Sequence, residues 1–264
     1  MDTITAALVL TSTDGAVLSL TLNRPDRLNA VTRELYESLR AAVRRAAGDE
    51  AVRSLILTGA GRAFCAGADV KAHAERPLPP RARRRYARAA QRANLSLQRC
   101  VKPVVAAVNG AAVGAGLELA LSCDFIVVAE DAQLRLPELA LGTFFGGGVA
   151  HTLPQRVGLT RAKELLFLGD FFSGRDAVAI GLANAAVPRE AVPAAALALA
   201  QRLAELAPVP LRRAKELLHR APHLSRRAVL REEARALRAC MATGDWAEGL
   251  AAQREQRSAR YTGA

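Results

Sequence analysis

The sequence predicts an α/β fold of stacked strand-strand-helix units, followed by a helical C-terminal region. Short apolar runs recur along the chain, each followed by a turn and a helical pattern, at 52–58, 103–108, 125–129 and 183–187. Adjacent β-branched residues in such runs are typical of strands buried on both faces of a sheet. No G-x-G-x-x-G segment follows the first strand, which weighs against a dinucleotide-binding Rossmann sheet.

The first part of the chain is predicted to form a β-hairpin and then an amphipathic helix. Residues 6–11 and 16–22 have the pattern of two strands, and Ser12–Gly15 between them are typical of a hairpin turn. Thr32 is a good N-cap for the helix that follows, because its hydroxyl can accept a backbone N–H of the first turn. Apolar residues at helical spacing continue this helix until Gly48.

The segment 102–148 has the residues best suited to chemistry. Residues 111–116 are almost all small, so the backbone can approach a ligand closely and present its N–H groups. A helical pattern follows, which places the amide of Ala115 near a helix N-terminus, where negative charge is stabilised. Glu118 lies in the first turn of that helix, and Glu138 lies in an aliphatic segment further on. Two carboxylates therefore bracket an amide turn suited to an oxyanion.

Each glutamate also has a structural interpretation when taken singly. A Glu in the first turn of a helix interacts favourably with the helix dipole, which describes Glu118. A Glu after a proline is typical of the first turn of a following helix, which describes Glu138. The combination of both with the amide turn favours a catalytic role.

Three blocks of sequence, in this order and spacing, resemble the crotonase superfamily, also called the enoyl-CoA hydratase/isomerase superfamily. They are GRAFCAGADVK at Gly61–Lys71, KPVVAAVNGAAVGAGLELALSCD at Lys102–Asp124 and LPELALG at Leu136–Gly142. The resemblance covers nearly the whole chain and implies a crotonase-like spiral. It also implies that the amides of Ala68 and Ala115 form an oxyanion hole, that Glu118 activates water and that Glu138 delivers a proton to the α-carbon.

The resemblance further implies a coenzyme A binding region, with coenzyme A as part of the substrate and no separate cofactor. The segment from Asn23 to Ala30 is similar to a family block that borders the CoA nucleotide, so Arg24 and Arg27 are candidates to face phosphate; as loop arginines they can equally be solvated. The candidate CoA-binding residues are Arg24, Arg27, Ala66, Ala68, Asp69 and Lys71.

Two regions depart from the family pattern. Many relatives have Gly where this chain has Ala115, so this residue must keep φ below zero or accept a left-handed strain. Phe144 and Phe145 occupy the place where a typical hydratase has Ile-Pro, which puts the acyl pocket in question. His151 lies at the start of a helical pattern, and we interpret it as structural.

The C-terminal part is almost wholly helical in pattern and is interrupted by Pro208, Pro210 and Pro222. We divide the chain into a core at 1–192 and a C-terminal helical region at 193–264. Because the family associates as trimers, often paired into hexamers, the resemblance implies a homotrimer or hexamer that uses these helices.

The composition places limits on the class of protein. The chain has 264 residues, of which 51% are hydrophobic, and a net charge of +12, so it can bury a large core and its surface attracts polyanions. The segment 81–92 is a strongly basic helix candidate, which is either a solvated face or a contact surface for CoA phosphates or another polyanion. Nucleic-acid binding is the alternative class, but this segment offers only Tyr86 for base stacking.

The four cysteines lie far apart, without the spacing of metal ligands or of a disulfide framework, at positions 65, 100, 123 and 240. The N-terminal residues lack the basic and apolar regions of a signal peptide, and no run is long enough to span a membrane. We therefore expect a cytoplasmic protein with reduced cysteines, which does not act at a membrane.

The reaction expected from these residues is hydration of a 2-enoyl-CoA thioester. Adding water across the double bond needs one group that activates water and one that protonates the α-carbon, and both positions hold Glu. A Δ3,Δ2-enoyl-CoA isomerase, which can act with one carboxylate, is the main alternative. Another CoA-thioester enzyme of the family, such as a hydrolase or decarboxylase, and an inactive scaffold are the others.

Overall fold

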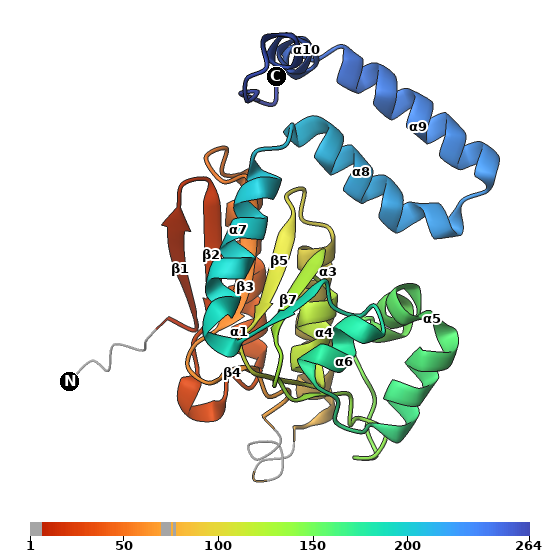
Figure 1. Ribbon diagram of the computed structural model, residues 1–264. Coiled ribbons are helices and arrows are strands. Elements are labelled where there is room, and N and C mark those ends of the chain that lie inside the picture. Colours follow the sequence, from red (N-terminus) through yellow and green to blue (C-terminus); the bar gives the residue numbers. More distant parts are fainter. Residues whose placement is uncertain (1–6, 70–74, 76–77) are drawn as a thin grey trace.

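The computed structural model describes residues 7–69, 75 and 78–264 (Figure 1). A six-stranded sheet forms its centre, with the strand order β1-β2-β3-β5-β7-β9. The strands are β1 Val9–Asp14, β2 Val17–Leu22, β3 Ser54–Gly59, β5 Val104–Val108, β7 Phe125–Ala129 and β9 Ala185–Val187. β1 is antiparallel to β2, and every other neighbouring pair in this sheet is parallel. The predicted α/β class is therefore confirmed.

A second, three-stranded sheet lies beside the first and was not predicted. It consists of β4 Ala63–Cys65, β6 Ala111–Val113 and β8 Leu134–Arg135, in the order β4-β6-β8. Its strands are parallel and only two or three residues long. Residues 111–116 were expected to form a turn, because small residues there give no strand pattern. This small sheet carries the turns of the candidate site.

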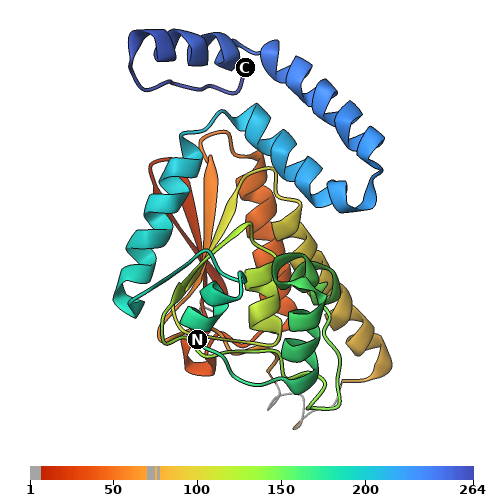
Figure 2. The same cartoon turned by 45° about the vertical axis from the view of Figure 1, so that its right-hand side comes forward.

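Helices cover both faces of the main sheet. They are α1 Arg33–Gly48, α3 Pro80–Gln98, α4 Ala115–Leu121, α5 Val149–Leu168, α6 Gly174–Ala179, α7 Val192–Ala204, α8 Pro208–Arg220, α9 Arg226–Met241 and α10 Gly244–Glu255, with 3-10 turns at Pro25–Arg27, Arg189–Ala191 and Ala221–His223. Figure 2 shows α7 on one face of the sheet and α1 and α3 on the other. The strands between them, such as β5, are buried along their whole length, as expected for a parallel sheet covered on both sides.

The N-terminal hairpin forms, but its turn differs from the predicted one. Asp14 pairs with Val17, so the turn consists of Gly15 and Ala16 and not of residues 12–15. Gly15 has a φ of 53°, which a glycine adopts without steric cost. The prediction of the α1 N-cap is confirmed, because the Thr32 hydroxyl accepts the Leu35 N–H at 3.2 Å.

The helical pattern breaks before Pro208 and around Pro222, as predicted, whereas Pro210 lies in the first turn of α8. Pro208 is the first residue of α8, where its missing N–H has no intrahelical partner to lose. α7 packs against the main sheet, whereas α8, α9 and α10 stand apart from it in Figure 1. An ion pair between Lys215 of α8 and Asp124 at 2.6 Å, with both side chains mostly buried, fastens α8 to the core. The division at 192 stays a prediction.

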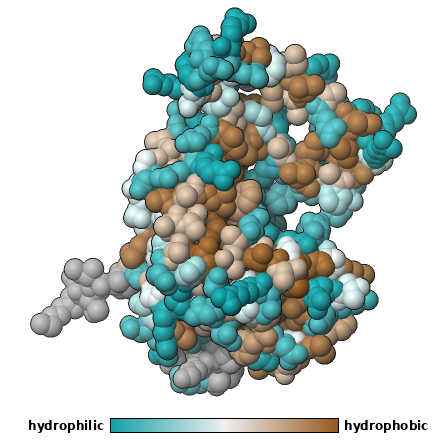
Figure 3. All heavy atoms as spheres, viewed as in Figure 1, coloured by the Kyte–Doolittle hydropathy of each residue, from teal (hydrophilic) through white to brown (hydrophobic). Residues whose placement is uncertain are grey.

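Apolar side chains gather along the C-terminal helices and on the part of the core that faces them (Figure 3). Among the helices of the described ranges, none combines the length and apolar character needed to cross a bilayer.

Candidate active site

Two turns lie side by side at the end of the small sheet. Strands β4 and β6 pair in parallel, with Cys65 opposite Ala112, so the chain leaves both strands in the same direction. Gly67 has a φ of 92°, and a side chain there would lie 2.6 Å from the Val113 carbonyl oxygen and 3.8 Å from the Ala115 nitrogen. Only a glycine can bring the first turn this close to the second. The structure therefore brings the two sequence-predicted amide turns together.

The amides of Ala68 and Ala115 have no hydrogen-bond acceptor among the described residues. Ala68 forms a parallel bridge with Val31, in which the Val31 N–H donates to the Gly67 carbonyl at 2.8 Å. In such a bridge the residues on either side of Ala68 make the hydrogen bonds, and the N–H of Ala68 itself is not used. Ala115 is the first residue of α4, so its N–H has no intrahelical acceptor. Within the described part of the chain, both N–H groups are thus available to a ligand oxygen.

Ala115 keeps φ below zero, which is the first of the two alternatives for this position. Of the described residues other than glycine, only Leu28, Asn29 and Gln256 have a positive φ. Gly114 takes the left-handed conformation instead, with a φ of 52°. The positive φ that this turn needs is therefore adopted by Gly114, and Ala115 fits without backbone strain.

Glu118 lies on α4 with its side chain enclosed by the protein. It is 3% exposed, and its Oε1 accepts the Gly146 N–H at 3.0 Å. Burial and then the charge of Glu138 raise the pKa of Glu118 to about 7, against the lowering effect of the Gly146 and Gly147 amides. A carboxyl group in this range can hold or release a proton near neutral pH.

Glu138 lies in the turn after β8, against the backbone of Gly114. A side chain on Gly114 would lie 2.6 Å from its Oε1, so this carboxyl borders the amide turn directly. Its Oε2 is buried without a hydrogen-bond partner among the described residues. Burial raises the pKa of Glu138, because desolvation disfavours the charged form. A protonated Glu138 would have a donor ready for a substrate atom.

The candidate CoA-binding residues are only partly available to a ligand. The Arg24 guanidinium forms an ion pair with Asp69 at 3.1 Å and donates to the Ala30 carbonyl at 2.5 Å, so it ties the 24–30 loop to the Ala68 turn. The Ala66 N–H donates to the Leu28 carbonyl at 2.9 Å. Arg27 is exposed. Lys71 lies outside the described residues.

Residues that were not predicted from the sequence surround Glu118. A side chain on Gly147 would lie 2.4 Å from the Glu118 Oε2 and 2.7 Å from the Asn94 Nδ2. Asn94 is fully buried, and its Oδ1 accepts the Ser122 hydroxyl at 2.7 Å. The run of three glycines at 146–148 was the available signal, because consecutive glycines mark a close backbone approach.

His151 makes its contacts at the surface, with His223 and Gln155. It is exposed and lies on the first turn of α5, where its ring stacks on His223 with the centroids 5.1 Å apart. Its Nε2 lies 3.1 Å from the Gln155 side-chain nitrogen. These contacts are with surface side chains, as the structural interpretation of His151 expects.

The amides of Ala68 and Ala115, which have no acceptor among the described residues, thus lie in the same part of the molecule as the carboxyl groups of Glu118 and Glu138, whose pKa values are raised. Such an arrangement can polarise a carbonyl group and move protons to and from neighbouring carbon or water. The cysteine nearest the amide turns, Cys65, is fully buried and burial raises its pKa to about 12. It is therefore not a nucleophile.

Comparisons with known proteins agree with this arrangement. The enoyl-CoA hydratase/isomerase family profile matches residues 12–264. The chain is 34% identical to the 2,3-dehydroadipyl-CoA hydratase of Escherichia coli (strain K12) over 255 residues, 97% of this chain and 98% of that protein. It is 34% identical to a mitochondrial enoyl-CoA hydratase of Pongo abelii over 255 residues, 91% of this chain and 81% of that protein.

The fold also matches a solved structure closely. The crystal structure of an enoyl-CoA hydratase from Bacillus anthracis aligns with a TM-score of 0.93 and 32% identity, and covers 97% of this chain and 100% of that one. This match confirms the predicted crotonase-like fold. The chain therefore belongs to the enoyl-CoA hydratase/isomerase family of the crotonase superfamily, whose members include CoA-thioester hydratases and isomerases.

Proposed function

We propose that the protein is an enoyl-CoA hydratase, which adds water reversibly across the 2,3-double bond of a 2-enoyl-CoA thioester. The observation that carries the proposal is the placement of two carboxyl groups, Glu118 and Glu138, beside two amides of adjacent turns that have no acceptor among the described residues. Hydration needs two proton-transfer groups, and isomerisation can proceed with one. The names of the relatives support the same activity.

The amides of Ala68 and Ala115 would hold the thioester oxygen. When water adds to the β-carbon, the electron pair of the double bond moves to this oxygen and forms an enolate. Two N–H donors aimed at the oxygen stabilise the enolate more than the neutral thioester. Loss of one such donor typically costs about 3 kcal/mol of transition-state stabilisation.

Glu118 would bind water and remove its proton. Support comes from its pKa of about 7, which makes the carboxylate a base strong enough to act near neutral pH and still ionised in a useful fraction. The Gly146 N–H fixes Oε1, which holds the carboxylate in place for the bound water. In the dehydration direction the same group returns the proton to the leaving hydroxyl.

Glu138 would deliver the proton to the α-carbon and collapse the enolate. Its buried Oε2 has no partner among the described residues, and burial favours its protonated form. A carboxylic acid beside a developing carbanion can transfer this proton directly. Two close carboxyls titrate as a coupled pair, which suits one acid and one base at the same pH.

The active protein would be a homotrimer or hexamer assembled through the C-terminal helices. Large apolar side chains on these helices are exposed in the single chain, and the most exposed include Leu218 at 74%, Leu237 at 60% and Leu230 at 55%. Contiguous exposed apolar surface of this kind marks protein interfaces. Sedimentation equilibrium measures the assembly directly, and a monomer at micromolar concentration would contradict the proposal.

The test of the reaction uses two variants and two readouts. Hydration is followed as the loss of conjugated thioester absorbance of a 2-enoyl-CoA, and α-proton exchange is followed with a 3-enoyl-CoA in D2O. Glu118→Ala should abolish hydration but retain exchange or double-bond migration, because the amides and Glu138 are still present. Glu138→Ala should lose both.

Two results would favour the isomerase over the hydratase. One is normal hydration by Glu118→Ala. The other is a wild-type enzyme that migrates 3-enoyl bonds much faster than it hydrates 2-enoyl bonds.

A further inference from the structure

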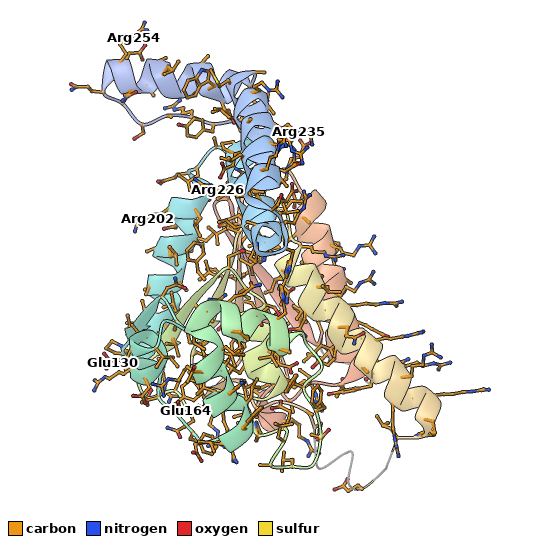
Figure 4. The ribbon with its side chains drawn as sticks, turned by 90° about the vertical axis from the view of Figure 1, so that its right-hand side faces the viewer. Glu130, Glu164, Arg202, Arg226, Arg235 and Arg254 are labelled. Carbon is orange, nitrogen blue, oxygen red and sulfur yellow. The ribbon has the colours of Figure 1, made fainter. Side chains whose placement is uncertain are left out.

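One face of α3 is buried against the core, and the polar side chain of Asn94 interrupts its apolar residues. Side chains tipped with nitrogen project from the other face, away from the rest of the molecule (Figure 4). The buried residues of the helix are Ala89, Ala90, Ala93, Asn94 and Leu97. Asparagine is a poor helix former, and burial of its amide costs free energy unless hydrogen bonds replace those made with water. Asn94 is fully buried, so such hydrogen bonds must compensate its amide.

The Asn94 side chain is held at both ends of its amide group. Its Oδ1 accepts the Ser122 hydroxyl at 2.7 Å, and its Nδ2 donates to the Ala90 carbonyl at 3.0 Å. A carbonyl oxygen only accepts, so the amide nitrogen must be the atom that faces Ala90. These contacts fix the orientation of the amide and use one of its two N–H groups. The second N–H has no acceptor within the described part of the chain.

The amide nitrogen of Asn94 lies beside the carboxyl group of Glu118. A methyl group on Gly147 would lie 2.4 Å from the Glu118 Oε2 and 2.7 Å from the Asn94 Nδ2, so both atoms border the same point. Gly147 does not have a positive φ, so a glycine is needed here for space and not for backbone conformation. Asn94 is fully buried and Glu118 is nearly so. The amide dipole therefore acts on the carboxyl group with little screening by water.

Asn94 also reaches the backbone of Glu118, through Ser122. The Ser122 hydroxyl lies 2.9 Å from the Glu118 carbonyl oxygen, and the Ser122 N–H donates to the same oxygen at 3.1 Å. The side chain of Gln98, also on α3, donates to the Ser122 hydroxyl at 3.2 Å. α4 has 7 residues, and a helix this short depends on tertiary contacts for its stability. Asn94 and Gln98 thus fasten the end of the helix that carries Glu118.

We propose that Asn94 is a positioning residue for Glu118, which orients its carboxyl group and favours the charged form that activates water. This inference rests on the proposed function. An N–H group near a carboxyl group stabilises the carboxylate more than the neutral acid, because the positive end of the N–H dipole attracts the charge. The second N–H of Asn94 is the part of the amide left for this interaction, and Ser122 holds the amide in place.

The other ionisable groups near Glu118 do not favour its charged form. Burial and then the charge of Glu138 raise the pKa of Glu118, against the lowering effect of two backbone N–H groups. Burial raises the pKa values of Tyr36 and Tyr86, which keeps both rings neutral near pH 7, and the charge of Glu118 adds to this rise. Asn94 supplies a side-chain donor that acts in the same direction as the backbone N–H groups.

The test uses two changes at Asn94 and a matched control on the same helix. Asn94→Leu removes both ends of the amide at similar volume. Asn94→Asp is isosteric and keeps an oxygen for Ser122, but it replaces the N–H groups with a second carboxyl oxygen. The control is Ser96→Ala, because the Ser96 hydroxyl donates to the Ala93 carbonyl of the same helix at 2.7 Å. Circular dichroism and thermal unfolding confirm that each variant is folded.

The first measurement compares hydration of a 2-enoyl-CoA with α-proton exchange of a 3-enoyl-CoA. In the proposed mechanism hydration needs Glu118, whereas exchange relies on Glu138 and the backbone amides. We expect both Asn94 variants to lower the kcat of hydration by about tenfold or more, since small misplacements of reacting groups are costly. Their KM and exchange rate should stay within about twofold of the wild type. Ser96→Ala should leave both rates within about twofold. A general loss of structure would lower both rates together, so their ratio reports the position of Glu118.

The second measurement does not depend on turnover. Isotope-labelled glutamate side chains are titrated by NMR, and the Glu118 signal is assigned by its loss in Glu118→Gln. Asn94→Leu should raise the pKa of Glu118, because the carboxylate loses a nearby donor. Asn94→Asp should raise it further, because a second carboxyl group disfavours the charged form. Ser96→Ala should leave the titration unchanged.

The outcomes separate this inference from the proposed function. An equal loss of hydration and exchange in Asn94→Leu, hydration at the wild-type rate, or an unchanged titration of Glu118 would overturn the inference and leave the hydratase proposal standing. A shifted titration, in a protein that does not hydrate 2-enoyl-CoA, would support the inference about Asn94 and reject the hydratase.

Discussion

The two glutamates of the site occupy surroundings of different character. Glu118 is 3% exposed and one of its oxygens is held by a backbone N–H of the glycine loop. Glu138 is 9% exposed and has a buried oxygen without a partner among the described residues. Burial raises the pKa of both; the backbone N–H groups of Gly146 and Gly147 oppose this rise at Glu118, whereas only its own backbone N–H opposes it at Glu138. The two carboxyl groups therefore have different hydrogen-bond surroundings, which is one way in which identical side chains can take different roles as base and acid.

Removal of either carboxyl group should have the largest effect on activity. We expect Glu118→Gln and Glu138→Gln each to lower hydration turnover by at least about a hundredfold, the lower end for a positioned acid or base. CoA binding should persist in both, because neither change touches the charged surface. Steady-state kinetics with a 2-enoyl-CoA and calorimetry with CoA measure the two effects. A variant that keeps near-normal turnover would remove its residue from the mechanism.

A side chain added to the glycine loop, residues 146–148, should lower activity by displacing the carboxylate of Glu118. In Gly147→Ala the new methyl group would meet the Glu118 Oε2 at 2.4 Å, so the carboxylate must move. We expect turnover to fall by about tenfold or more, since small misplacements of reacting groups are costly. Gly146→Ala is the matched control, because a side chain there meets nothing within 4 Å and its N–H is kept. Equal kinetics in the two variants would show that Glu118 is not held by close packing with this loop.

The raised pKa of Glu118 should also be visible in stability. Its folded pKa is about 7 against an ordinary value of 4.5, so between these pH values the folded state binds more protons than the unfolded state. The free energy of unfolding should therefore fall as pH rises from 4.5 through 7, by up to about 3 kcal/mol. Glu118→Gln removes this dependence. Urea unfolding of both proteins at pH 5 and pH 8 measures it, and parallel pH profiles would contradict the assignment.

The smallest effect is expected at His151. This side chain stacks on His223 at the surface and contacts neither glutamate. His151→Asn should leave turnover nearly unchanged and lower the free energy of unfolding by at most about 1 kcal/mol, the usual range for an exposed site. Thermal unfolding and the hydration assay check both. A folded variant without activity would show that the site extends to α5.

The sequence by itself determined the α/β class, the buried strands and the turns that carry the two amides. Apolar runs with β-branched residues predicted β5 and β7 closely, because a strand covered on both faces must be apolar throughout. Family blocks identified Glu118 and Glu138 as candidates, because the blocks are contiguous in sequence. Thr32 was recognisable as a cap since capping depends on a few neighbouring residues.

Only the tertiary structure decided how these residues meet. The small sheet of β4, β6 and β8 has strands too short to leave a periodic signal, yet it sets the two amide turns side by side. The ion pair of Lys215 with Asp124 joins α8 to the core, and the hydrogen bond from the Gly146 N–H to Glu118 joins residues that are 28 positions apart. Such contacts depend on packing between distant segments, which no local pattern encodes. The pKa values follow from the same packing, because burial and neighbouring charge exist only in the folded chain.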